Sequence, residues 1–253
     1  MSKGTIVYIG GFELPDKNAA AHRVINNGKM LRECGYDVVF IDVDKTLKYE
    51  NKYMLKKNIQ GFECWSKPYP VKVGEWIHYL SNTESVVEIL AKYKNVKGVI
   101  CYNYQSIAFL KLKKYCNSNK VKIFADCTEW YSTKGSNFLF KIVKGFDSYL
   151  RMRIIQKNLD GLIVISSYLS NYYKNCKNVV CIPPLVDLKE EKWNMISVIE
   201  DNNINLVYAG NPGKSKDSLN IVFEVLDEIK NEISNFKLNV VGLTREQYVK
   251  NYT

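Results

Sequence analysis

One stretch near the N-terminus indicates the fold class of this chain: Thr5-Ile-Val-Tyr-Ile-Gly-Gly-Phe-Glu-Leu-Pro-Asp-Lys-Asn-Ala-Ala-Ala-His-Arg23. A short apolar run is followed by two adjacent glycines and then by the start of an amphipathic helix, predicted over Ala19–Cys34. Gly35 ends that helix as its C′ residue, and Asp37 opens the next apolar run. The order of strand, glycine turn, helix and strand is typical of an α/β protein.

The same alternation continues as far as residue 182. The expected strands are short and rich in valine and isoleucine, as strands buried on both faces of a sheet are. They are Thr5–Ile9, Asp37–Ile41, Val96–Cys101, Val121–Ala125, Leu162–Ile165 and Val179–Ile182. The expected helices are Ala19–Cys34, Thr83–Tyr93, Ile107–Asn117, Phe138–Asn158 and Tyr168–Asn175. The sequence therefore predicts an α/β fold with a Rossmann-like parallel sheet and helices on both of its faces.

Two stretches interrupt this alternation. Val43–Tyr79 carries charges, prolines and tryptophans, and it is interpreted as an excursion that holds a short hairpin or edge strands. Pro183-Pro184 opens a polar stretch that is interpreted as a linker. We therefore expect an N-terminal Rossmann-like domain at residues 1–184, a linker at residues 185–203, and the incomplete start of a second Rossmann-like domain at residues 204–253.

The composition favours a folded cytoplasmic protein. Hydrophobic residues make up 46% of the chain, which is enough for a packed core. The chain has seven cysteines, which is an odd number, and no two of them form a C-x-x-C pair. We therefore expect reduced, buried thiols and no metal site. No signal peptide and no membrane-spanning run is recognised. The predicted location is the cytoplasm, with peripheral contact at the inner face of the membrane as an alternative.

The formal charge of +10 points to an anionic partner or reflects composition alone. Lysines cluster in Lys45–Lys57, in Lys111–Lys114 and around Lys134–Lys144. An anionic lipid surface, a phosphorylated substrate or nucleic acid would suit such charge. Because the lysines are spread over many segments, a lysine-rich composition that serves solubility is an equal explanation. Nucleic acid has no support beyond the charge and is not expected as a partner.

Two turns have the form of anion-binding sites. In the first, Gly10 and Gly11 let the backbone pass close to a ligand, and the helix start offers free N–H groups. A purely structural role for this glycine pair is the alternative. The second turn lies in Asn205-Leu-Val-Tyr-Ala-Gly-Asn-Pro-Gly-Lys-Ser-Lys-Asp217, where a strand leads through a turn with Lys214 and Lys216 into a new helix. The first turn lacks the G-x-G-x-x-G fingerprint, and no Walker loop occurs.

Four segments, taken in order, resemble a known family. Gly10–Leu31 contains Gly-Gly-Phe, Leu-Pro-Asp and Ala-Ala-His-Arg. Asp126-Cys-Thr-Glu-Trp-Tyr131 follows a central strand, and Asp160-Gly-Leu-Ile-Val-Ile-Ser-Ser167 is a strand that ends in serine. Val179-Val-Cys-Ile-Pro-Pro-Leu-Val-Asp187 enters the linker. Together they resemble GT-B glycosyltransferases, and more narrowly family 4 members of bacterial surface-polysaccharide pathways. The resemblance covers nearly the whole chain.

The resemblance implies a transferase with two Rossmann-like domains. The N-terminal domain would hold a glycan or lipid-linked acceptor, and the C-terminal domain a nucleotide-sugar donor, with a hexosyltransferase-type reaction in the cleft between them. The configuration of the sugar would be retained. No metal and no other cofactor is implied, because fixed cations and N–H dipoles would stabilise the departing diphosphate.

The resemblance also assigns roles to residues on both sides of that cleft. The residues expected near the donor phosphates are Gly10, Gly11, Gly210, Lys214 and Lys216. The alternative for either lysine is that it is a solvated residue at the start of a helix. His22 and Arg23 would line the acceptor side, or would cap or support the first helix.

Two further pairs of residues lie beyond expected strands. Asp126 or Glu129 would orient an acceptor hydroxyl or act as the base. The alternative is that Asp126 caps the following segment and that Glu129 is a surface residue. Tyr102 and Tyr104 would stack on a sugar or a base on the acceptor side, although packing in a core or at its rim is the commoner role of such residues.

Members of this family carry a pair of glutamates, written E-x7-E, well inside the donor domain. No such pair is recognised at a corresponding position in this sequence. Glu224 and Glu232 have the spacing, but they fall in the first predicted helix of the second domain, so the match is interpreted as coincidence. The rest of a donor domain would need about another hundred residues. We therefore expect a truncated chain with an incomplete donor site that is weakly active or inactive. A non-catalytic binding or scaffold protein on a truncated GT-B frame is the alternative.

Overall fold

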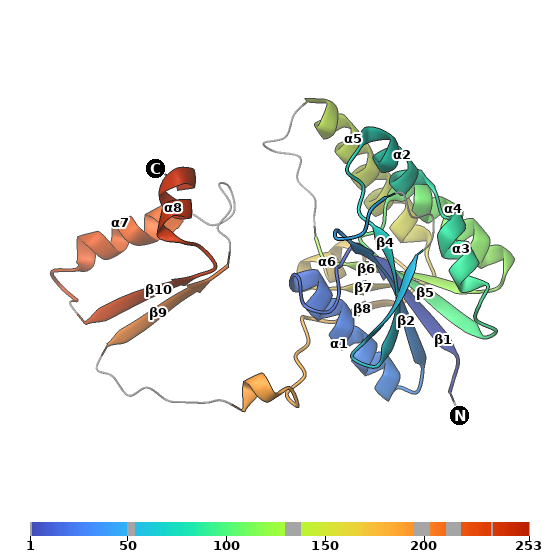
Figure 1. Ribbon diagram of the computed structural model, residues 1–253, viewed down its shortest axis with the longest axis horizontal. Helices are drawn as coiled ribbons and strands as arrows, with labels where there is room; N and C mark the ends of the chain where they lie inside the picture. The colour runs from blue at the N-terminus through green and yellow to red at the C-terminus, as the bar shows by residue number, and fades with distance from the viewer. Residues whose placement is uncertain are drawn as a thin grey trace. The chain divides into compact units, whose positions relative to one another are not determined.

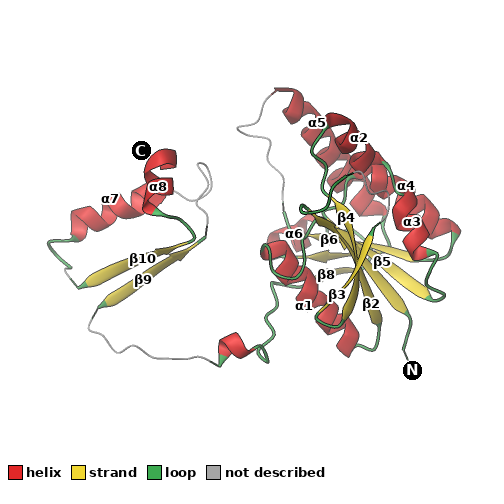
Figure 2. Cartoon of the chain, in the orientation of Figure 1, coloured by secondary structure: helices red, strands yellow, loops and turns green. Residues whose placement is uncertain are grey.

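The computed structural model describes residues 2–49, 54–129, 138–194, 203–210, 219–233 and 235–252 (Figures 1 and 2). The chain divides into two compact units, Met1–Leu188 and Lys189–Thr253. None of the helices in the described ranges is long and apolar enough to cross a membrane. The two units are described separately below.

The first unit is built on one sheet with the strand order β3-β4-β2-β1-β5-β6-β7-β8. Its strands are β1 Thr5–Gly10, β2 Asp37–Asp44, β3 Leu55–Ile59, β4 Phe62–Pro68, β5 Val96–Tyr102, β6 Lys122–Cys127, β7 Gly161–Val164 and β8 Val179–Cys181. Every neighbouring pair is parallel except β3 and β4, which pair antiparallel at the edge. All six predicted strands are confirmed. Five of them, β1, β2, β5, β6 and β7, are interior strands of the sheet, as their valine- and isoleucine-rich runs indicate, whereas β8 is an edge strand and is largely exposed.

Helices cover both faces of this sheet (Figure 1). They are α1 Ala19–Glu33, α2 Val73–Ser81, α3 Glu84–Leu90, α4 Ser106–Ser118, α5 Phe138–Tyr149 and α6 Ser167–Tyr172. A π-helical segment, Leu150–Ile155, and a 3-10 turn, Gln156–Asn158, follow α5. The five predicted helices are confirmed in position, and Gly35 follows α1 with a φ of +91°, as expected of a C′ glycine.

Successive residues of β1 face two separate hydrophobic cores, because side chains alternate across a strand. Val7 and Ile9 lie in the core that includes Phe109 and Leu112 of α4. Ile6 and Tyr8 lie in the core that includes Val24 and Ile25 of α1. The sheet is therefore buried on both faces, as the predicted fold class requires.

The excursion after β2 is confirmed as a hairpin, since β3 and β4 pair antiparallel and β4 also joins β2. It is followed by a helix, α2, that the sequence analysis did not predict. Pro68, Pro70 and Gly74 pointed to irregular structure there. The helix forms because the Glu75 carboxylate accepts hydrogen bonds from the Val71 and Lys72 backbone N–H groups, at 2.8 and 2.9 Å, and so caps its first turn.

The cysteines are all free, at Cys34, Cys64, Cys101, Cys116, Cys127, Cys176 and Cys181. Four of them are buried, but Cys34 and Cys181 are exposed, so the expectation of buried thiols is wrong for these two. Each lies where a regular element ends: Cys34 follows the last residue of α1, and Cys181 is the last residue of β8. The hydrophobic cores do not extend to these ends.

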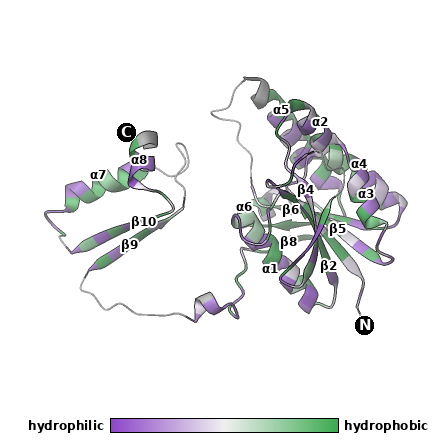
Figure 3. Cartoon of the chain, viewed as in Figure 1, coloured by the Kyte–Doolittle hydropathy of each residue, from purple (hydrophilic) through white to green (hydrophobic). Residues whose placement is uncertain are grey.

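The second unit contains β9 Ile204–Ala209, α7 Leu219–Ile229, β10 Phe236–Val241 and α8 Arg245–Tyr252, preceded by a 3-10 turn, Glu191–Trp193. The strands β9 and β10 are parallel, so β9, α7 and β10 form a strand–helix–strand unit. Figure 3 shows hydrophobic residues along both strands and α7. Several of those on α7 are exposed, among them Ile221 and Val225.

Candidate functional site

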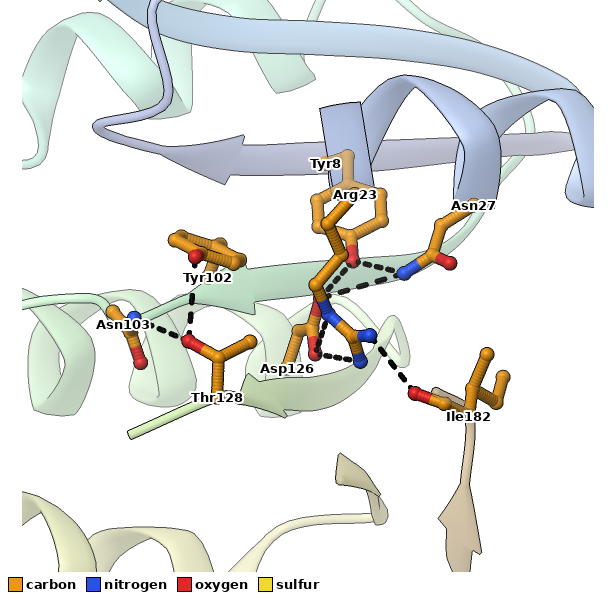
Figure 4. A network of polar contacts seen from close by, with 8 residues as sticks. All are labelled: Tyr8, Arg23, Asn27, Tyr102, Asn103, Asp126, Thr128 and Ile182. Atoms are coloured by element: carbon orange, nitrogen blue, oxygen red, sulfur yellow. Dashed lines mark hydrogen bonds and ion pairs between the residues drawn. The ribbon is translucent and has the colours of Figure 1, made fainter. Parts of the chain in front are cut away.

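The candidate site lies at the carboxyl edge of the first unit's sheet, where β1, β5 and β6 end. In open α/β sheets, ligands bind beyond the carboxyl ends of the strands. Gly11 follows β1, Asn103 follows β5, and Thr128 follows β6. Most residues that the sequence analysis assigned to the acceptor side lie here, and Figure 4 shows the polar network that joins several of them.

A buried ion pair between Arg23 and Asp126 is the centre of this network. The Arg23 Nη2 atom lies 2.7 Å from Asp126 Oδ1, and Nε lies 3.0 Å from Oδ2, so the guanidinium binds both carboxylate oxygens. The Tyr8 hydroxyl donates to Asp126 Oδ2 at 2.5 Å, and Asn27 Nδ2 donates to the Tyr8 hydroxyl at 3.1 Å. Arg23 Nη1 also donates to the Ile182 carbonyl at 2.8 Å. These bonds connect α1, β1, β6 and the residue after β8.

Burial and hydrogen bonding shift the pKa values of both members of the pair. Burial raises the pKa of the Asp126 carboxyl, and the hydrogen bonds from Arg23 and Tyr8 oppose that rise. Burial lowers the pKa of Arg23, but the Asp126 carboxylate outweighs this effect and holds it above its ordinary value. Asp126 is 0% exposed and Arg23 only 4% exposed, so the pair acts by positioning α1 against β6 and the residue after β8.

A second chain of hydrogen bonds joins the ends of β5 and β6. The Thr128 hydroxyl donates to the Tyr102 hydroxyl at 3.3 Å and accepts from Asn103 Nδ2 at 2.9 Å (Figure 4). Arg151, from the segment after α5, donates to the Asn103 carbonyl at 3.1 Å. Tyr102 is buried in the core that contains Phe12, whereas Glu129, one residue beyond Thr128, is exposed.

Tyr104 lies on the other side of the end of β5, in a setting that the sequence analysis did not foresee. It is 2% exposed, and its hydroxyl has no hydrogen-bond partner among the described residues. The Lys67 ammonium lies 5.9 Å from the centre of its ring and 4.4 Å from that of Tyr79. The signal in the sequence was slight: Lys67 is a lone basic residue at a strand end between two aromatic residues, Trp65 and Tyr69.

The two glycines of the first turn differ in their surroundings. A Cβ atom on Gly10 would lie 2.8 Å from the Tyr102 carbonyl oxygen, because β1 and β5 pair at this point. Gly10 is therefore required by packing. Gly11 is exposed, and a Cβ atom there would approach the Tyr79 hydroxyl no closer than 3.4 Å. Gly11 is the glycine of the pair that leaves the backbone open to a ligand.

This difference predicts opposite results for two matched substitutions. Gly10→Ala is expected to lower the free energy of unfolding by about 1–3 kcal/mol, since neither backbone can yield without disturbing the sheet. Gly11→Ala is expected to change it by no more than about 0.5 kcal/mol. Urea denaturation of both variants measures the difference. Equal losses for the two would show that Gly10 is not held by its contact with Tyr102.

His22 lies in the first turn of α1 and is exposed. The turn is capped by Asn18, whose Oδ1 atom accepts a hydrogen bond from the Ala21 N–H at 3.0 Å. His22 is therefore not the cap of this helix. Its neighbour Arg23 lies in the buried network, so the structure separates two adjacent residues that the sequence analysis had grouped together.

In the second unit, Gly210 follows β9 and packs against Gly242. A Cβ atom on Gly242 would lie 2.7 Å from the Gly210 carbonyl oxygen, so these two turns can meet only if residue 242 is glycine. Lys214 and Lys216, the other residues expected near the donor phosphates, lie outside the described residues.

Comparison with known proteins finds a likeness of fold to several solved structures. No protein-family model and no curated protein sequence matches the chain. The chain is similar to sucrose-phosphate synthase from Thermosynechococcus elongatus, with 12% identity over 94% of this chain and 71% of that one and a TM-score of 0.54. It is similar to trehalose-6-phosphate synthase from E. coli bound with UDP-2-fluoro glucose, with 11% identity, coverages of 95% and 65%, and a TM-score of 0.61.

A third similar structure is a UGT transferase from Siraitia grosvenorii in complex with UDP, with 10% identity, coverages of 96% and 66%, and a TM-score of 0.53. Identities of 10–12% show the fold alone. The predicted fold class is thus confirmed as the Rossmann-like α/β fold of GT-B proteins. The chain spans 65–71% of the length of these three proteins.

Proposed function

We propose that this chain belongs to a GT-B glycosyltransferase that transfers a sugar from a nucleotide-sugar to a glycan or lipid-linked acceptor. The observation that carries the proposal is the likeness of fold over 94–96% of the chain to solved transferases and synthases. Two of those structures hold UDP or a UDP-sugar. The finer assignment, to a retaining enzyme of family 4 and of bacterial surface-polysaccharide synthesis, rests on the sequence motifs.

In this proposal the first unit, Met1–Leu188, binds the acceptor, and the second unit, Lys189–Thr253, binds the donor. The Arg23–Asp126 pair is buried and positions α1, so Gly11 and Glu129, which are exposed, are the predicted site residues of this edge that would meet substrates. Glu129 would orient or deprotonate an acceptor hydroxyl. Gly210, Lys214 and Lys216 would stabilise the charge that develops on the departing diphosphate, without a metal. The net charge of +10 would favour an anionic membrane at the cytoplasmic face.

Release of nucleoside diphosphate by the intact protein tests this proposal. A panel of UDP-, GDP- and dTDP-sugars is incubated with and without glycan and lipid-linked acceptors. Release that depends on an acceptor is expected with at least one donor. Lys216→Ala is expected to slow it about 10- to 100-fold, because a fixed cation at the leaving group is lost. Lys230→Ala, which removes an exposed lysine paired with Asp227 on α7, is the matched control and should change little.

Two other outcomes would decide against the proposal. If no donor binds and none is turned over, the fold does not serve glycosyl transfer in this protein. If a glycan binds but no donor supports release, the protein is a non-catalytic binding protein on a GT-B frame.

A further inference from the structure

A lysine without a carboxylate partner lies at the carboxyl edge of the sheet, apart from the Arg23–Asp126 network. Lys67 is the penultimate residue of β4 and is only partly exposed. No described residue forms an ion pair or hydrogen bond with its ammonium group, and burial alone lowers its pKa, to about 8. A desolvated charge is unfavourable unless something compensates it, so a lysine left in this state is a candidate binding group.

The groups around Lys67 are aromatic and polar. Its ammonium lies over the face of Tyr79, 4.4 Å from the ring centre, and 5.9 Å from the ring centre of Tyr104. Such cation–π contacts hold the charge in place without neutralising it. Tyr79 comes from α2, and Tyr104 follows β5, so three separate elements bring these side chains together.

Two polar atoms beside Tyr79 are buried without hydrogen-bond partners among the residues that the structure describes, and the Gln105 side chain is placed here by its contact with Tyr79. The Tyr104 hydroxyl, on a side chain 2% exposed, has no hydrogen-bond partner among the described residues, and neither has Gln105 Oε1. Buried polar groups in folded proteins are nearly always satisfied, so an unsatisfied pair needs an explanation. A hydroxyl can donate and an amide oxygen can accept, which together suit a ligand that carries both an anionic group and a hydroxyl.

The position of this cluster fits a substrate site. Gly11, the open glycine of the first turn, lies next to it, since a Cβ atom on Gly11 would be 3.4 Å from the Tyr79 hydroxyl. The strands β4, β1 and β5 run parallel, so their carboxyl ends, which bear Lys67, Gly11 and Tyr104, share one edge of the sheet. Ligands of open α/β sheets bind at that edge.

We propose that Lys67, Tyr104 and Gln105 form a subsite for an anionic sugar, with Lys67 and the Tyr104 hydroxyl binding a carboxylate or phosphate group and Gln105 accepting from a sugar hydroxyl. The acceptor of the proposed transfer reaction is then an acidic or phosphorylated sugar, a conclusion that rests on the proposed function. The subsite itself does not depend on that function, because it is defined by groups of the first unit alone.

Direct binding to the intact protein, without donor, tests the subsite. The probes are glucuronate and glucose, which differ by a carboxylate, together with inorganic phosphate, each titrated by isothermal calorimetry or NMR. Glucuronate is expected to bind at least 10-fold more tightly than glucose if the sugar that the subsite recognises carries a carboxylate. Phosphate is expected to bind more tightly than glucuronate if it is a phosphate.

Three variants and one control make the test specific. Lys67→Met is expected to weaken binding of the preferred anion at least 10-fold and to leave glucose unaffected, whereas Lys67→Arg keeps most of the affinity. Tyr104→Phe removes only the hydroxyl and is expected to weaken binding several-fold. The control is Lys92→Met, because Lys92 also lies over an aromatic ring, at 4.2 Å from the centre of Trp65, but is exposed. It should have no effect.

The subsite is overturned if neither anion binds, or if Lys67→Met and Lys92→Met behave alike. These outcomes differ from failure of the proposed function. Anion binding that requires Lys67, with no release of nucleoside diphosphate from any donor, would keep the subsite and reject the transfer reaction. Release with neutral acceptors and no anion binding would keep the transfer reaction and reject the subsite.

Discussion

Replacing Asp126 by alanine is expected to lower the free energy of unfolding by about 3–5 kcal/mol, because it leaves the Arg23 guanidinium buried without its counter-charge. Arg23 is 4% exposed and Asp126 is 0% exposed, so water cannot replace the lost partner unless the structure opens. The Tyr8 hydroxyl would lose its acceptor as well. Urea denaturation at pH 7 measures the loss, and Glu129→Ala, three residues further on and exposed, should change the stability by no more than about 0.5 kcal/mol.

A double substitution separates this explanation from a simple loss of packing. If the ion pair is responsible, Arg23→Met combined with Asp126→Leu is expected to cost much less than the sum of Arg23→Met and Asp126→Leu made singly, since no unpaired charge remains. Additive losses, or a loss below about 1 kcal/mol for Asp126→Ala, would contradict the role given to the pair.

Replacing Lys67 by methionine is expected to stabilise the protein at pH 7, although the residue belongs to the proposed subsite. The pKa of Lys67 is lowered from 10.5 to about 8, and one pKa unit corresponds to about 1.4 kcal/mol. The charged form is therefore disfavoured by about 3.5 kcal/mol at most. Partial exposure and the loss of cation–π contacts with Tyr79 and Tyr104 reduce the net gain, which we expect to be about 1–2 kcal/mol.

The pH dependence of this gain has a definite sign. Below pH 8 the lysine is charged in both the folded and the unfolded protein, so the full cost of the buried charge is present in the parent protein. Between about pH 8 and 10.5 the folded protein releases the proton first, and the parent regains stability relative to the variant. The difference in urea midpoint between Lys67→Met and the parent should therefore shrink from pH 7 to pH 10. A destabilising effect, or a gain that does not change with pH, would show that the Lys67 charge is not desolvated.

The architecture of the first unit could be predicted from the sequence because its central strands are buried on both faces. Such strands are short apolar runs, and Ile6–Ile9 and Val38–Ile41 have this pattern. The helix α2 was missed because Gly74 and two prolines near its start mask a first turn that depends on one side chain, Glu75.

The site could be predicted only in part. The strand ends that bear Gly11, Tyr104 and Glu129 were recognised, because a ligand edge follows from the order of strands and helices. The pairing of Arg23 with Asp126 could not be foreseen, since the two residues are 103 positions apart in the sequence. They meet because of the order of the strands in the sheet, in which β5 lies between β1 and β6. Lys67 was missed for the same reason: nothing local shows that the hairpin joins β2 and so brings this lysine to Tyr104.

The measurement that tests the central claim most directly is mass spectrometry of acceptors after incubation of the intact protein with nucleotide-sugars. Acidic, phosphorylated and neutral glycans, free and lipid-linked, are offered together with each donor. The account predicts that an acidic or phosphorylated acceptor gains the mass of one glycosyl residue, in step with release of nucleoside diphosphate, and that Lys67→Met reduces this product. If no acceptor gains a glycosyl residue with any donor, this protein uses its fold for a purpose other than glycosyl transfer.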